Sequence, residues 1–407
     1  MVGNVVIVGA GQAAVQAIDT LRRHHFGGRL TLIGAEPQLP YQRPPLSKKY
    51  LAGALARERL LLRPASFYAQ HAVETRLGRR VEAIERREQR LRLDDGTSVA
   101  YDALLLSTGS RPRPLAVPGT DLEGVFSLRT VADAERIRPA LTSGARLVIV
   151  GGGYIGLEAA ATAQELGAAV TVLELAPRLI GRVTCNAVSD FYAAEHERHG
   201  VRIVYGAQVQ AIAAHRTQQR VRAVITEDGQ EYAADAVLLG VGAVPASELA
   251  SSAGLPCEDG IRVDEYCRTT DPAIYAAGDC ANLPSPHYGR RLRLESVDNA
   301  FEQGASAALN LLGQATVHDK VPWFWSDQYD LKLVIVGISA GYDELVLRGN
   351  PATRAFTACY LREGELIALD SINTPKDQLA ARKLIPARAR PDRARLADPG
   401  VTLQQAC

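Results

Sequence analysis

Two short glycine-rich motifs, 142 residues apart, constrain the fold of this chain more than any other feature. The first spans residues 9–14 (GAGQAA) and the second spans residues 151–156 (GGGYIG); each follows an apolar run and precedes a helical pattern and a second apolar run. In such a strand–turn–helix–strand unit, one glycine permits the tight turn, the next lets a pyrophosphate approach the backbone, and the last small residue lets the helix pack closely on the strand. Two such units predict two dinucleotide sites.

A second pair of similar segments indicates that one unit has been duplicated. Residues 102–109 (DALLLSTG) resemble residues 235–242 (DAVLLGVG), and each follows a hairpin-like stretch with an Asp-Gly turn. Each similar segment is typical of a buried strand. We expect it to be the last strand of its nucleotide unit.

The composition argues against several classes of partner. The 407 residues carry 46 basic and 45 acidic side chains, a formal charge of +1, which indicates neither a nucleic acid nor a membrane surface. The longest uncharged apolar stretch, 236–247, is too short to span a bilayer. The six cysteines form no C-x-x-C motif and the eight histidines have no metal-ligand spacing. With no targeting segment visible, we expect free thiols, no metal and a cytoplasmic location.

A third motif indicates which nucleotides are bound. Residues 269–279 form an apolar strand pattern that ends in Gly278-Asp279. Together with the two glycine motifs, this resembles the two-dinucleotide flavoprotein disulfide reductase superfamily, in which that aspartate binds the ribityl chain of FAD. The resemblance implies an α/β fold of the glutathione-reductase type, with two Rossmann-like dinucleotide-binding domains and a C-terminal α+β interface domain. It also implies bound FAD and NADH as a substrate.

We expect three domains. The FAD-binding domain is discontinuous, over residues 1–112 and 244–320, and the NAD-binding domain over 113–243 is inserted into it. Prolines near both crossovers favour extended chain. From residue 321 the glycine motifs stop, and a smaller interface domain follows over 321–407. Its predicted strands are 331–336, 344–347, 355–361 and 365–372.

The position of the cysteines selects one branch of the superfamily. Disulfide reductases place a cysteine pair beside the flavin, but residues 34–56 contain none. Residues 40–48 (PYQRPPLSK) and 322–329 (PWFWSDQY) instead resemble the FAD-dependent ferredoxin reductases of bacterial oxygenase systems. The likeness runs from about residue 4 to about residue 377 and implies an NADH-dependent ferredoxin reductase. Hydride would pass from NADH to FAD, and single electrons would then pass to a two-iron ferredoxin.

The resemblance leaves the acceptor open. We expect the ferredoxin to feed a haem-thiolate monooxygenase. A Rieske dioxygenase ferredoxin, a rubredoxin, a quinone or dehydroascorbate radical are alternatives on the same scaffold. A protein of another class, a flavin-dependent redox sensor of the apoptosis-inducing-factor type, would oxidise NADH slowly with every acceptor. We expect a monomer or a weak dimer.

Three residues are predicted by resemblance to act at the flavin. Lys48 is expected near flavin N5, where its ammonium stabilises negative charge and pairs with Glu158. Trp325 is expected at the dimethylbenzene edge. Each residue also has an ordinary structural interpretation. Lys48 would then be a surface lysine, Glu158 a favourable acid in the first turn of a helix, and Trp325 part of ordinary aromatic packing.

The FAD contacts are carried over by the same resemblance. Arg129 is expected at the pyrophosphate, Pro45 on the isoalloxazine ring and Glu36 at the ribose. Ala35 stands where the family often has an acid, so the ribose contact comes from Glu36 alone or from backbone. The full predicted FAD set is Gly9, Gly11, Ala13, Ala14, Glu36, Pro45, Lys48, Val81, Thr108, Gly109, Arg129, Gly278, Asp279, Val297 and Trp325.

The NAD contacts lie around the second glycine motif. Glu174 ends the apolar run after it, and an acid there accepts a hydrogen bond from the ribose 2′-OH and repels a 2′-phosphate, which favours NADH. Arg178 and Arg182 lie close enough in sequence to weaken that preference. By resemblance, Arg182 holds the pyrophosphate and Glu295 the carboxamide. The predicted NAD set is Gly151, Gly153, Ile155, Gly156, Glu158, Glu174, Arg182, Gly242 and Glu295.

The near-zero net charge conceals two basic clusters. Residues 376–395 contain seven basic side chains against two acidic ones, and Arg290, Arg291 and Arg293 form a second cluster. A charge run is usually a solvated face. The expected ferredoxin is acidic, so we hypothesise that one of these clusters docks it by electrostatic steering.

Overall fold

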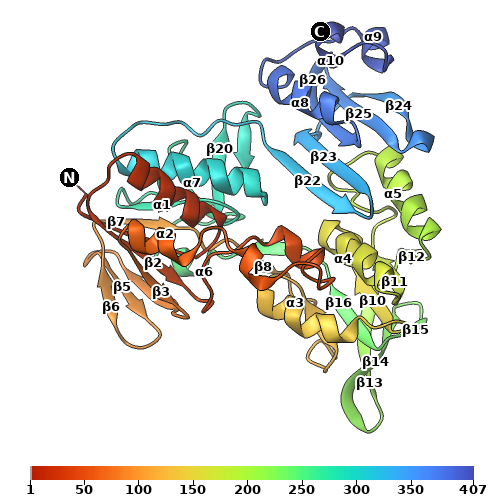
Figure 1. Cartoon of the computed structure of the whole chain (residues 1–407), viewed down its shortest axis with the longest axis horizontal. Coiled ribbons are helices and arrows are strands. Elements are labelled where there is room, and N and C mark those ends of the chain that lie inside the picture. Colours follow the sequence, from red (N-terminus) through yellow and green to blue (C-terminus); the bar gives the residue numbers. More distant parts are fainter. Residues whose placement is uncertain (1) are drawn as a thin grey trace. The chain divides into compact units, whose positions relative to one another are not determined.

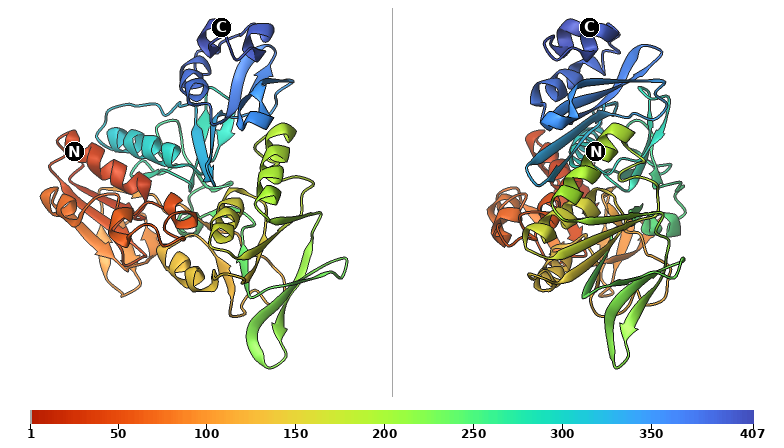
Figure 2. Two further views of the ribbon diagram at one scale, coloured as in Figure 1. Left: turned by 45° about the vertical axis from the view of Figure 1, so that its right-hand side comes forward. Right: turned by 90° about the vertical axis from the view of Figure 1, so that its right-hand side faces the viewer.

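The computed structural model describes residues 2–407 and divides the chain into two compact units, shown as ribbons in Figures 1 and 2. The first unit comprises the residues up to Gln42, Glu58–Arg111 and Ala243–Pro322. The second comprises Arg43–Arg57, Pro112–Gly242 and Trp323–Cys407. Two of these divisions lie within one residue of the expected crossovers, and the division into three domains stays a prediction. The sequence did not anticipate that residues 43–57 group with the second unit, nor that the C-terminal segment groups there too.

A parallel five-stranded sheet forms the centre of the first unit, in the order β19-β7-β1-β2-β3. Val5 and Ile7 of β1 belong to a core with the helices α1 and α7, whereas Val6 and Val8 face a second core that includes the strands β4–β6. Both faces of the sheet are covered, which is why the sequence shows an unbroken apolar run. The strands are β1 (Asn4–Val8), β2 (Arg29–Gly34), β3 (Val73–Leu77), β7 (Ala103–Leu106) and β19 (Ile274–Ala276).

Two helices pack closely on one face of this sheet. Helix α1 (Gln12–Arg23) buries Val15, Ile18 and Leu21, as the apolar spacing predicted, and it lies beside α7 (Val297–Leu311). A Cβ atom on Gly304 of α7 would lie 2.4 Å from the carbonyl oxygen of Ala13. The glycine therefore permits this close approach of the two helices.

The second unit repeats this arrangement in its own parallel sheet, in the order β12-β11-β10-β16-β9. The central strand β10 pairs with β11 and β16 as β1 pairs with β2 and β7, so the predicted duplication is visible in the strand order. The edge strands differ in their place in the sequence: β19 comes after all the other strands of its sheet, whereas β9 comes before all the other strands of its sheet. The elements are β9 (Val125–Ser127), α3 (Val131–Ile137), β10 (Arg146–Val150), α4 (Tyr154–Glu165), β11 (Ala169–Glu174), α5 (Asn186–Arg198), β12 (Arg202–Tyr205) and β16 (Ala236–Leu239).

Each unit also carries the small antiparallel sheet that the Asp-Gly turns predicted. Gly96 and Gly229 have φ angles of +79° and +80°, the left-handed region that such turns require. The strands are β4 (Val81–Glu85), β5 (Arg90–Leu93) and β6 (Ser98–Ala100) in the first unit, and β13 (Val209–His215), β14 (Gln218–Thr226) and β15 (Glu231–Ala233) in the second.

The C-terminal segment forms an antiparallel sheet in the order β22-β23-β26-β25-β24, followed by three short helices. The four predicted strands are present, and the structure adds β22, which carries the PWFWSDQY motif. Arg348, at 6% exposure, donates to Asp377 and to backbone carbonyls of residues 396–401, which fixes the tail on the sheet. The elements are β22 (Trp323–Gln328), β23 (Leu331–Gly337), β24 (Glu344–Asn350), β25 (Ala355–Arg362), β26 (Glu365–Ile372), α8 (Pro375–Leu384), α9 (Arg393–Ala397) and α10 (Leu403–Ala406).

Short elements complete the chain. They are η1 (Pro44–Ser47), η2 (Arg57–Leu60), α2 (Ala65–Gln70), β8 (Ser110–Pro112), η3 (Arg138–Ala140), β17 (Ala243–Pro245), α6 (Glu248–Ser252), β18 (Ile261–Arg262), β20 (Ala281–Ser285), β21 (Arg290–Leu292) and η4 (Pro351–Thr353). Within residues 2–407, no helix has the length and apolar character needed to cross a membrane.

Candidate functional site

The first glycine motif forms an anion cradle at the start of α1. Gly9 has φ +106°, and a Cβ there would lie 2.2 Å from the carbonyl oxygen of Ser107, so only glycine fits. Gly11 is the N-cap of α1, and no protein atom lies within 4 Å of where its Cβ would be. No side chain caps the helix and its first turn has no acid, so its N–H groups and dipole are available to a phosphate.

The second motif builds the same cradle at the start of α4. Gly151 has φ +108°, and a Cβ there would lie 2.5 Å from the carbonyl oxygen of Gly240. Gly153 caps α4 without a side-chain hydrogen bond and has open space around it. A Cβ on Gly156 would lie 2.3 Å from the carbonyl oxygen of Gly151, so this glycine allows the helix to approach the turn. Both cradles fit a dinucleotide pyrophosphate.

The Gly278-Asp279 motif lies in the first unit and carries a feature that sequence reasoning missed. Gly278 (φ +82°) donates its N–H to Oε1 of Gln303 at 2.7 Å, and Ser110 Oγ donates to Asp279 Oδ2 at 2.8 Å. The Nε2 group of Gln303 is fully buried and has no hydrogen-bond partner among the described residues. An unpaired buried donor next to this motif fits a site completed by a polar ligand. The only sequence signal was a polar residue within the buried face of a helix.

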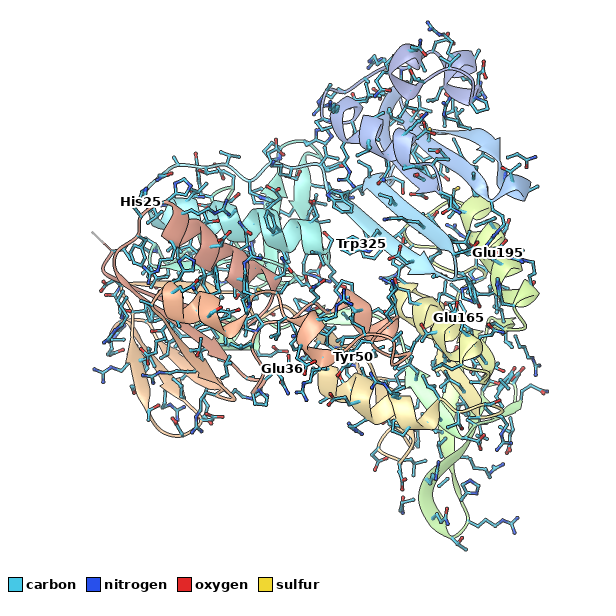
Figure 3. All side chains as sticks on the ribbon, in the orientation of Figure 1. His25, Glu36, Tyr50, Glu165, Glu195 and Trp325 are labelled. Atoms are coloured by element: carbon cyan, nitrogen blue, oxygen red, sulfur yellow. The ribbon has the colours of Figure 1, made fainter. Side chains whose placement is uncertain are left out.

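The two acids predicted at ribose positions differ in their surroundings. Glu174 is held by backbone: its Oε2 accepts from the Gly152 N–H and its Oε1 from the Ala176 N–H, each at 2.6 Å. Glu36 instead accepts a hydrogen bond from the hydroxyl of Tyr41. Glu36 is labelled in Figure 3. Glu174 is the last residue of β11 and Glu36 lies two residues after β2, so both are at the end of the second strand, where a ribose contact is expected.

Lys48 and Glu158 form the ion pair that the resemblance implied. Lys48 Nζ lies 3.0 Å from Glu158 Oε1 and 3.9 Å from Asp327 Oδ2. Glu158 Oε2 accepts from Ser47 Oγ at 2.5 Å, and Oε1 accepts from Ser326 Oγ at 2.7 Å. Burial raises the pKa of Glu158, while Lys48 and the two serine hydroxyls oppose that shift. The carboxylate is therefore a buried charge that depends on these few partners.

Trp325 lies on β22 of the second unit and is labelled in Figure 3. It is half-buried, and its ring centroid lies 5.4 Å from that of Trp323, with the planes tilted by 32°. The guanidinium of Arg382, from α8, lies 3.8 Å from the centre of the Trp323 ring, a cation–π contact. The two tryptophans thus connect the strand to the basic helix α8.

The remaining predicted contacts are distributed through both units. Arg43 Nη1 donates to the carbonyl oxygen of Arg129 at 2.7 Å, and Thr108 Oγ1 donates to the carbonyl of Ala246 at 2.6 Å. Glu295 is ion-paired with Arg293. The other predicted contacts lie in loops or in the first residues of elements; they are Ala13, Ala14, Pro45, Val81, Gly109, Ile155, Arg182, Gly242 and Val297. Their roles toward the nucleotides stay predictions.

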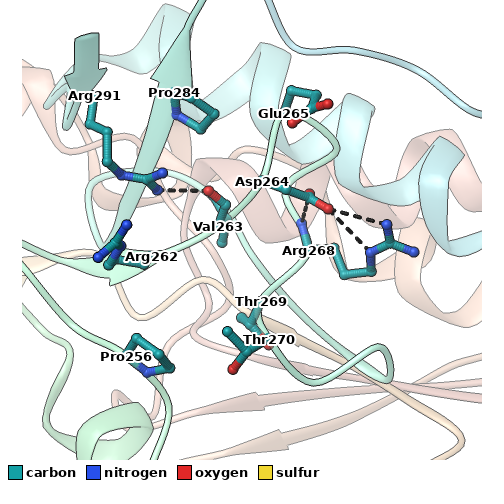
Figure 4. Close-up of a pocket in the computed structure, with 10 residues that line it drawn as sticks. All are labelled: Pro256, Arg262, Val263, Asp264, Glu265, Arg268, Thr269, Thr270, Pro284 and Arg291. Atoms are coloured by element: carbon teal, nitrogen blue, oxygen red, sulfur yellow. Dashed lines mark hydrogen bonds and ion pairs between the residues drawn. The ribbon is translucent and has the colours of Figure 1, made fainter.

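The Arg290–Arg293 cluster is largely occupied by internal contacts. Arg291 donates to the carbonyl of Val263 at 2.7 Å and to Asn282 Oδ1 at 3.0 Å, and Arg293 lies 2.9 Å from Asp259. Arg291 lines a pocket of about 450 Å³, shown in Figure 4, which also contains the Asp264–Arg268 ion pair. The pocket lies apart from both glycine motifs in sequence, and two of its arginines, Arg262 and Arg268, are ion-paired with Glu258 and Asp264.

Two cradles on two parallel sheets define a class of protein: an oxidoreductase that holds two dinucleotides. A family model described as pyridine nucleotide-disulphide oxidoreductase matches residues 3–304, and one described as reductase C-terminal matches residues 323–407. The chain therefore belongs to the pyridine nucleotide-disulphide oxidoreductase family.

Particular relatives match over almost the whole length. The chain is 43% identical to the 5,5'-dehydrodivanillate O-demethylase ferredoxin reductase subunit of Sphingobium sp., covering 98% of this chain and 97% of that protein. It is 42% identical to putidaredoxin reductase of Pseudomonas putida (99% and 96%) and 42% identical to the ferredoxin–NAD(+) reductase component of the anthranilate 1,2-dioxygenase system of Burkholderia cepacia (98% and 98%). The structure matches that of the covalent putidaredoxin reductase–putidaredoxin complex with a TM-score of 0.97, covering 99% and 98% of the two chains.

The family assignment gives FAD and NADH as the cofactors of this chain. When bound, FAD would supply the two-electron chemistry, namely acceptance of a hydride from NADH and release of two single electrons and one proton. The residues of this chain supply binding and electrostatics. The cradles and the Gly278-Asp279 motif are the residues that would hold and orient the two dinucleotides, and the Lys48–Glu158 pair places a charge of each sign in a buried setting.

Proposed function

We propose that this chain is an NADH-dependent ferredoxin reductase that delivers single electrons to a two-iron ferredoxin of an oxygenase system. The observation that carries the proposal is the pair of glycine cradles on a chain without a cysteine in residues 34–56. Relatives of similar length are named as ferredoxin reductases, and one was crystallised with its ferredoxin. The test is NADH-dependent reduction of purified two-iron ferredoxins. Equal rates with a rubredoxin or a quinone would contradict it.

We propose that Lys48 stabilises negative charge on the reduced flavin, with Glu158 as its buried partner. Lys48 is largely buried, whereas the adjacent Lys49 is exposed. Lys48→Ala should slow flavin reduction by NADH or lower the flavin potential, because it removes the cation but leaves the carboxylate. Lys49→Ala is the matched control and should behave as the unmodified protein in stopped-flow reduction. Identical traces for both variants would refute the role of Lys48.

We further propose that ferredoxin docks on the exposed face of α8. Lys376, Leu379 and Lys383 are exposed and occupy positions three and four residues apart, so they share one face of the helix. Leu379 is 59% exposed, and a large apolar side chain between two lysines suits an interface centre with a charged rim. On the same helix, Arg382 stacks on Trp323, which packs against Trp325. The Arg290–Arg293 cluster is the weaker candidate, since Arg291 and Arg293 are occupied internally.

A charge reversal tests this surface. Lys376→Glu with Lys383→Glu should raise the KM for an acidic ferredoxin at least tenfold at low salt and should flatten its dependence on ionic strength, because steering by opposite charges is lost. Arg216→Glu, in the exposed turn between β13 and β14, is the matched control. The docking proposal fails if the two proteins show the same KM for ferredoxin at every salt concentration.

The downstream enzyme and the cellular setting stay predictions. We propose a haem-thiolate monooxygenase system, with a Rieske dioxygenase system as the alternative, since the ferredoxin reductase for a CYP199A2 system and the reductase component of an anthranilate 1,2-dioxygenase system match with 41% and 42% identity. Reconstitution with each type of ferredoxin and oxygenase separates them. We propose a monomer or weak dimer, which sedimentation would test, and a cytoplasmic location, which cell fractionation would test.

A further inference from the structure

A chain of hydrogen bonds leads from Glu158 through the interior of the second unit. Glu158 Oε1 accepts from Ser326 Oγ at 2.7 Å, and Ser326 Oγ accepts from Gln328 Nε2 at 3.1 Å. Gln328 Oε1 lies 2.8 Å from His196 Nε2, and His196 Nδ1 lies 3.1 Å from the hydroxyl of Tyr329. Ser326, Gln328 and His196 are at most 1% exposed. Three buried polar side chains and the half-buried Tyr329 thus lie in series behind one carboxylate.

The hydrogen bonds of the series all run in one direction, because some of its atoms can donate a proton and others can only accept one. With the Gln328 amide in this orientation its Oε1 accepts, which assigns the His196 proton to Nε2. Burial lowers the pKa of His196 to about 4, so the ring is neutral near pH 7 and its Nδ1 accepts from Tyr329. Each group then donates toward Glu158. The ring of Tyr329 is itself held by stacking on His199, at 3.8 Å between centroids and 8° between planes.

The opposite direction would change the site. With the proton on Nδ1, His196 would accept from a flipped Gln328 amide, and Gln328 would accept from Ser326. The Ser326 hydroxyl proton would then point away from Glu158, which would lose one donor. The tautomer of a remote histidine therefore decides whether Glu158 receives this hydrogen bond.

We propose that His196 and Gln328 are positioning residues that hold the Ser326 hydroxyl proton on Glu158 and thereby keep Glu158 ionised and paired with Lys48. The consequence for catalysis rests on the proposed function, in which Lys48 serves the flavin. The ionisation of Glu158 itself does not depend on it. A hydrogen bond to a buried charge is worth more than one between neutral groups, so one donor can decide the protonation state.

The alternation of side chains along β22 places both polar residues of the series on its buried face. Ser326 and Gln328 alternate with Trp325 and Asp327, so the two polar side chains share the buried face of the strand. Apolar side chains at these two positions could be buried without hydrogen-bond partners, whereas two buried polar side chains need a partner for each donor and acceptor. The partners in the series satisfy it.

Other ionisable groups also surround the two ends of the series. Near Glu158 these are Lys48 of the η1 segment, Asp327 of β22, Tyr154 of α4 and Tyr192 of α5. Near His196 they are Glu195, His199 and Tyr329, and Glu195 is ion-paired with Arg198 and Arg354. Burial raises the pKa values of Tyr154 and Tyr192 far above neutrality, so they do not titrate in the range of the test.

The first experiment measures the protonation of Glu158 in the FAD-loaded protein by infrared spectroscopy, with Glu158→Gln used to identify its carboxyl band. Ser326→Ala and Gln328→Leu should each raise the midpoint of this titration by about one pH unit, a tenfold change in the protonation constant. The double variant should show no more than Ser326→Ala alone, because Gln328 acts through Ser326. Ser326→Thr, which keeps the hydroxyl, should restore the midpoint.

Ser371→Ala is the matched control, since it removes a buried serine hydroxyl from β26 of the same sheet. It should leave the Glu158 midpoint unchanged. Additive effects of Ser326→Ala and Gln328→Leu, or an equal shift in Ser371→Ala, would overturn the proposal, because both outcomes indicate general loosening of the core.

The second experiment reads the histidine directly. Nitrogen-15 NMR of labelled histidine should show His196 with its proton on Nε2, and His196→Gln should identify the signal. A protonated Nδ1 at pH 7 would overturn the assigned direction. Neither this measurement nor the infrared titration uses NADH or ferredoxin, so a wrong acceptor assignment would leave both results interpretable.

Discussion

The buried carboxyl of Asp370 makes the stability of the second unit depend on pH. Asp370 lies on β26 with no exposed surface, and its Oδ2 accepts hydrogen bonds from the hydroxyls of Tyr360 and Thr184. Its Oδ1 has no partner among the described residues. Burial raises the pKa of Asp370 from 3.8 to about 7, although the two hydroxyls oppose the shift. The folded protein therefore favours the protonated form.

The sign and size of the effect follow from linkage. Because the folded-state pKa lies above the unfolded value, the contribution to stability is fully present below about pH 4 and is lost as the pH rises through about 7. Each pH unit between these values costs about 1.4 kcal/mol. Asp370→Asn cannot ionise, so the difference in unfolding free energy between variant and parent should grow by about 2.5 kcal/mol in favour of the variant from pH 5 to pH 8.

The assay is urea unfolding of the FAD-loaded protein at half-unit pH steps. Comparing the change with pH, instead of the absolute stability, removes any constant cost of placing an amide in the site. Tyr192→Phe is the control: its hydroxyl is buried without a partner among the described residues, and its raised pKa lies far above this range. Its difference from the parent should not vary with pH. A flat profile for Asp370→Asn would refute the argument that this carboxyl is neutral in the fold.

Three further outcomes are expected. Gly11→Ala should fold but lose most of its FAD affinity, because the added Cβ meets no protein atom and occupies the space through which the phosphate approaches. Gly9→Ala should lose FAD affinity and also fold poorly, because its Cβ would clash with backbone. Flavin fluorescence measures the binding of FAD, and circular dichroism measures the folding. Glu174→Gln should lower the ratio of kcat/KM for NADH over NADPH roughly tenfold, since one like charge facing the 2′-phosphate is removed. Arg348→Met should lower the free energy of unfolding by about 3–5 kcal/mol, measured in urea, because it leaves Asp377 buried without its cation.

The features that the sequence predicted well are those set by local chain geometry. Gly9 and Gly151 predict positive φ angles, and the apolar runs before them predict strands that are covered on both faces. The Asp-Gly pairs predict the turns of the small antiparallel sheet in each unit. These signals are strong because each depends on residues close together in sequence, where backbone sterics leave few choices.

What the sequence did not predict depends on contacts between distant residues. Gln303 lies 25 residues after Gly278, and His196 lies 132 residues before Gln328, so no spacing rule connects them. Strand β22 was recognised as a motif but not as a strand, since its two tryptophans and one phenylalanine obscure the alternation. The C-terminal tail gave no pattern because Arg348 fixes it through backbone carbonyls, which every sequence has.

The helices that follow the two glycine motifs differ at one buried position, where an amide in the first corresponds to a carboxylate in the second. With the offset of 142 residues, Gln16 of α1 corresponds to Glu158 of α4, and Thr20 corresponds to Thr162. In the first helix the pair is self-contained, because Gln16 Nε2 donates to Thr20 Oγ1 at 3.1 Å and both are buried. In the second helix Thr162 donates instead to the carbonyl of Ser47 at 2.8 Å, and the carboxylate at the position of the amide binds Lys48. A buried amide can be satisfied within one helix, but a buried carboxylate needs a cation and several donors. The segment 43–57 groups with the second unit, and it brings Ser47 and Lys48 to the buried position where α4 has a carboxylate and α1 has an amide.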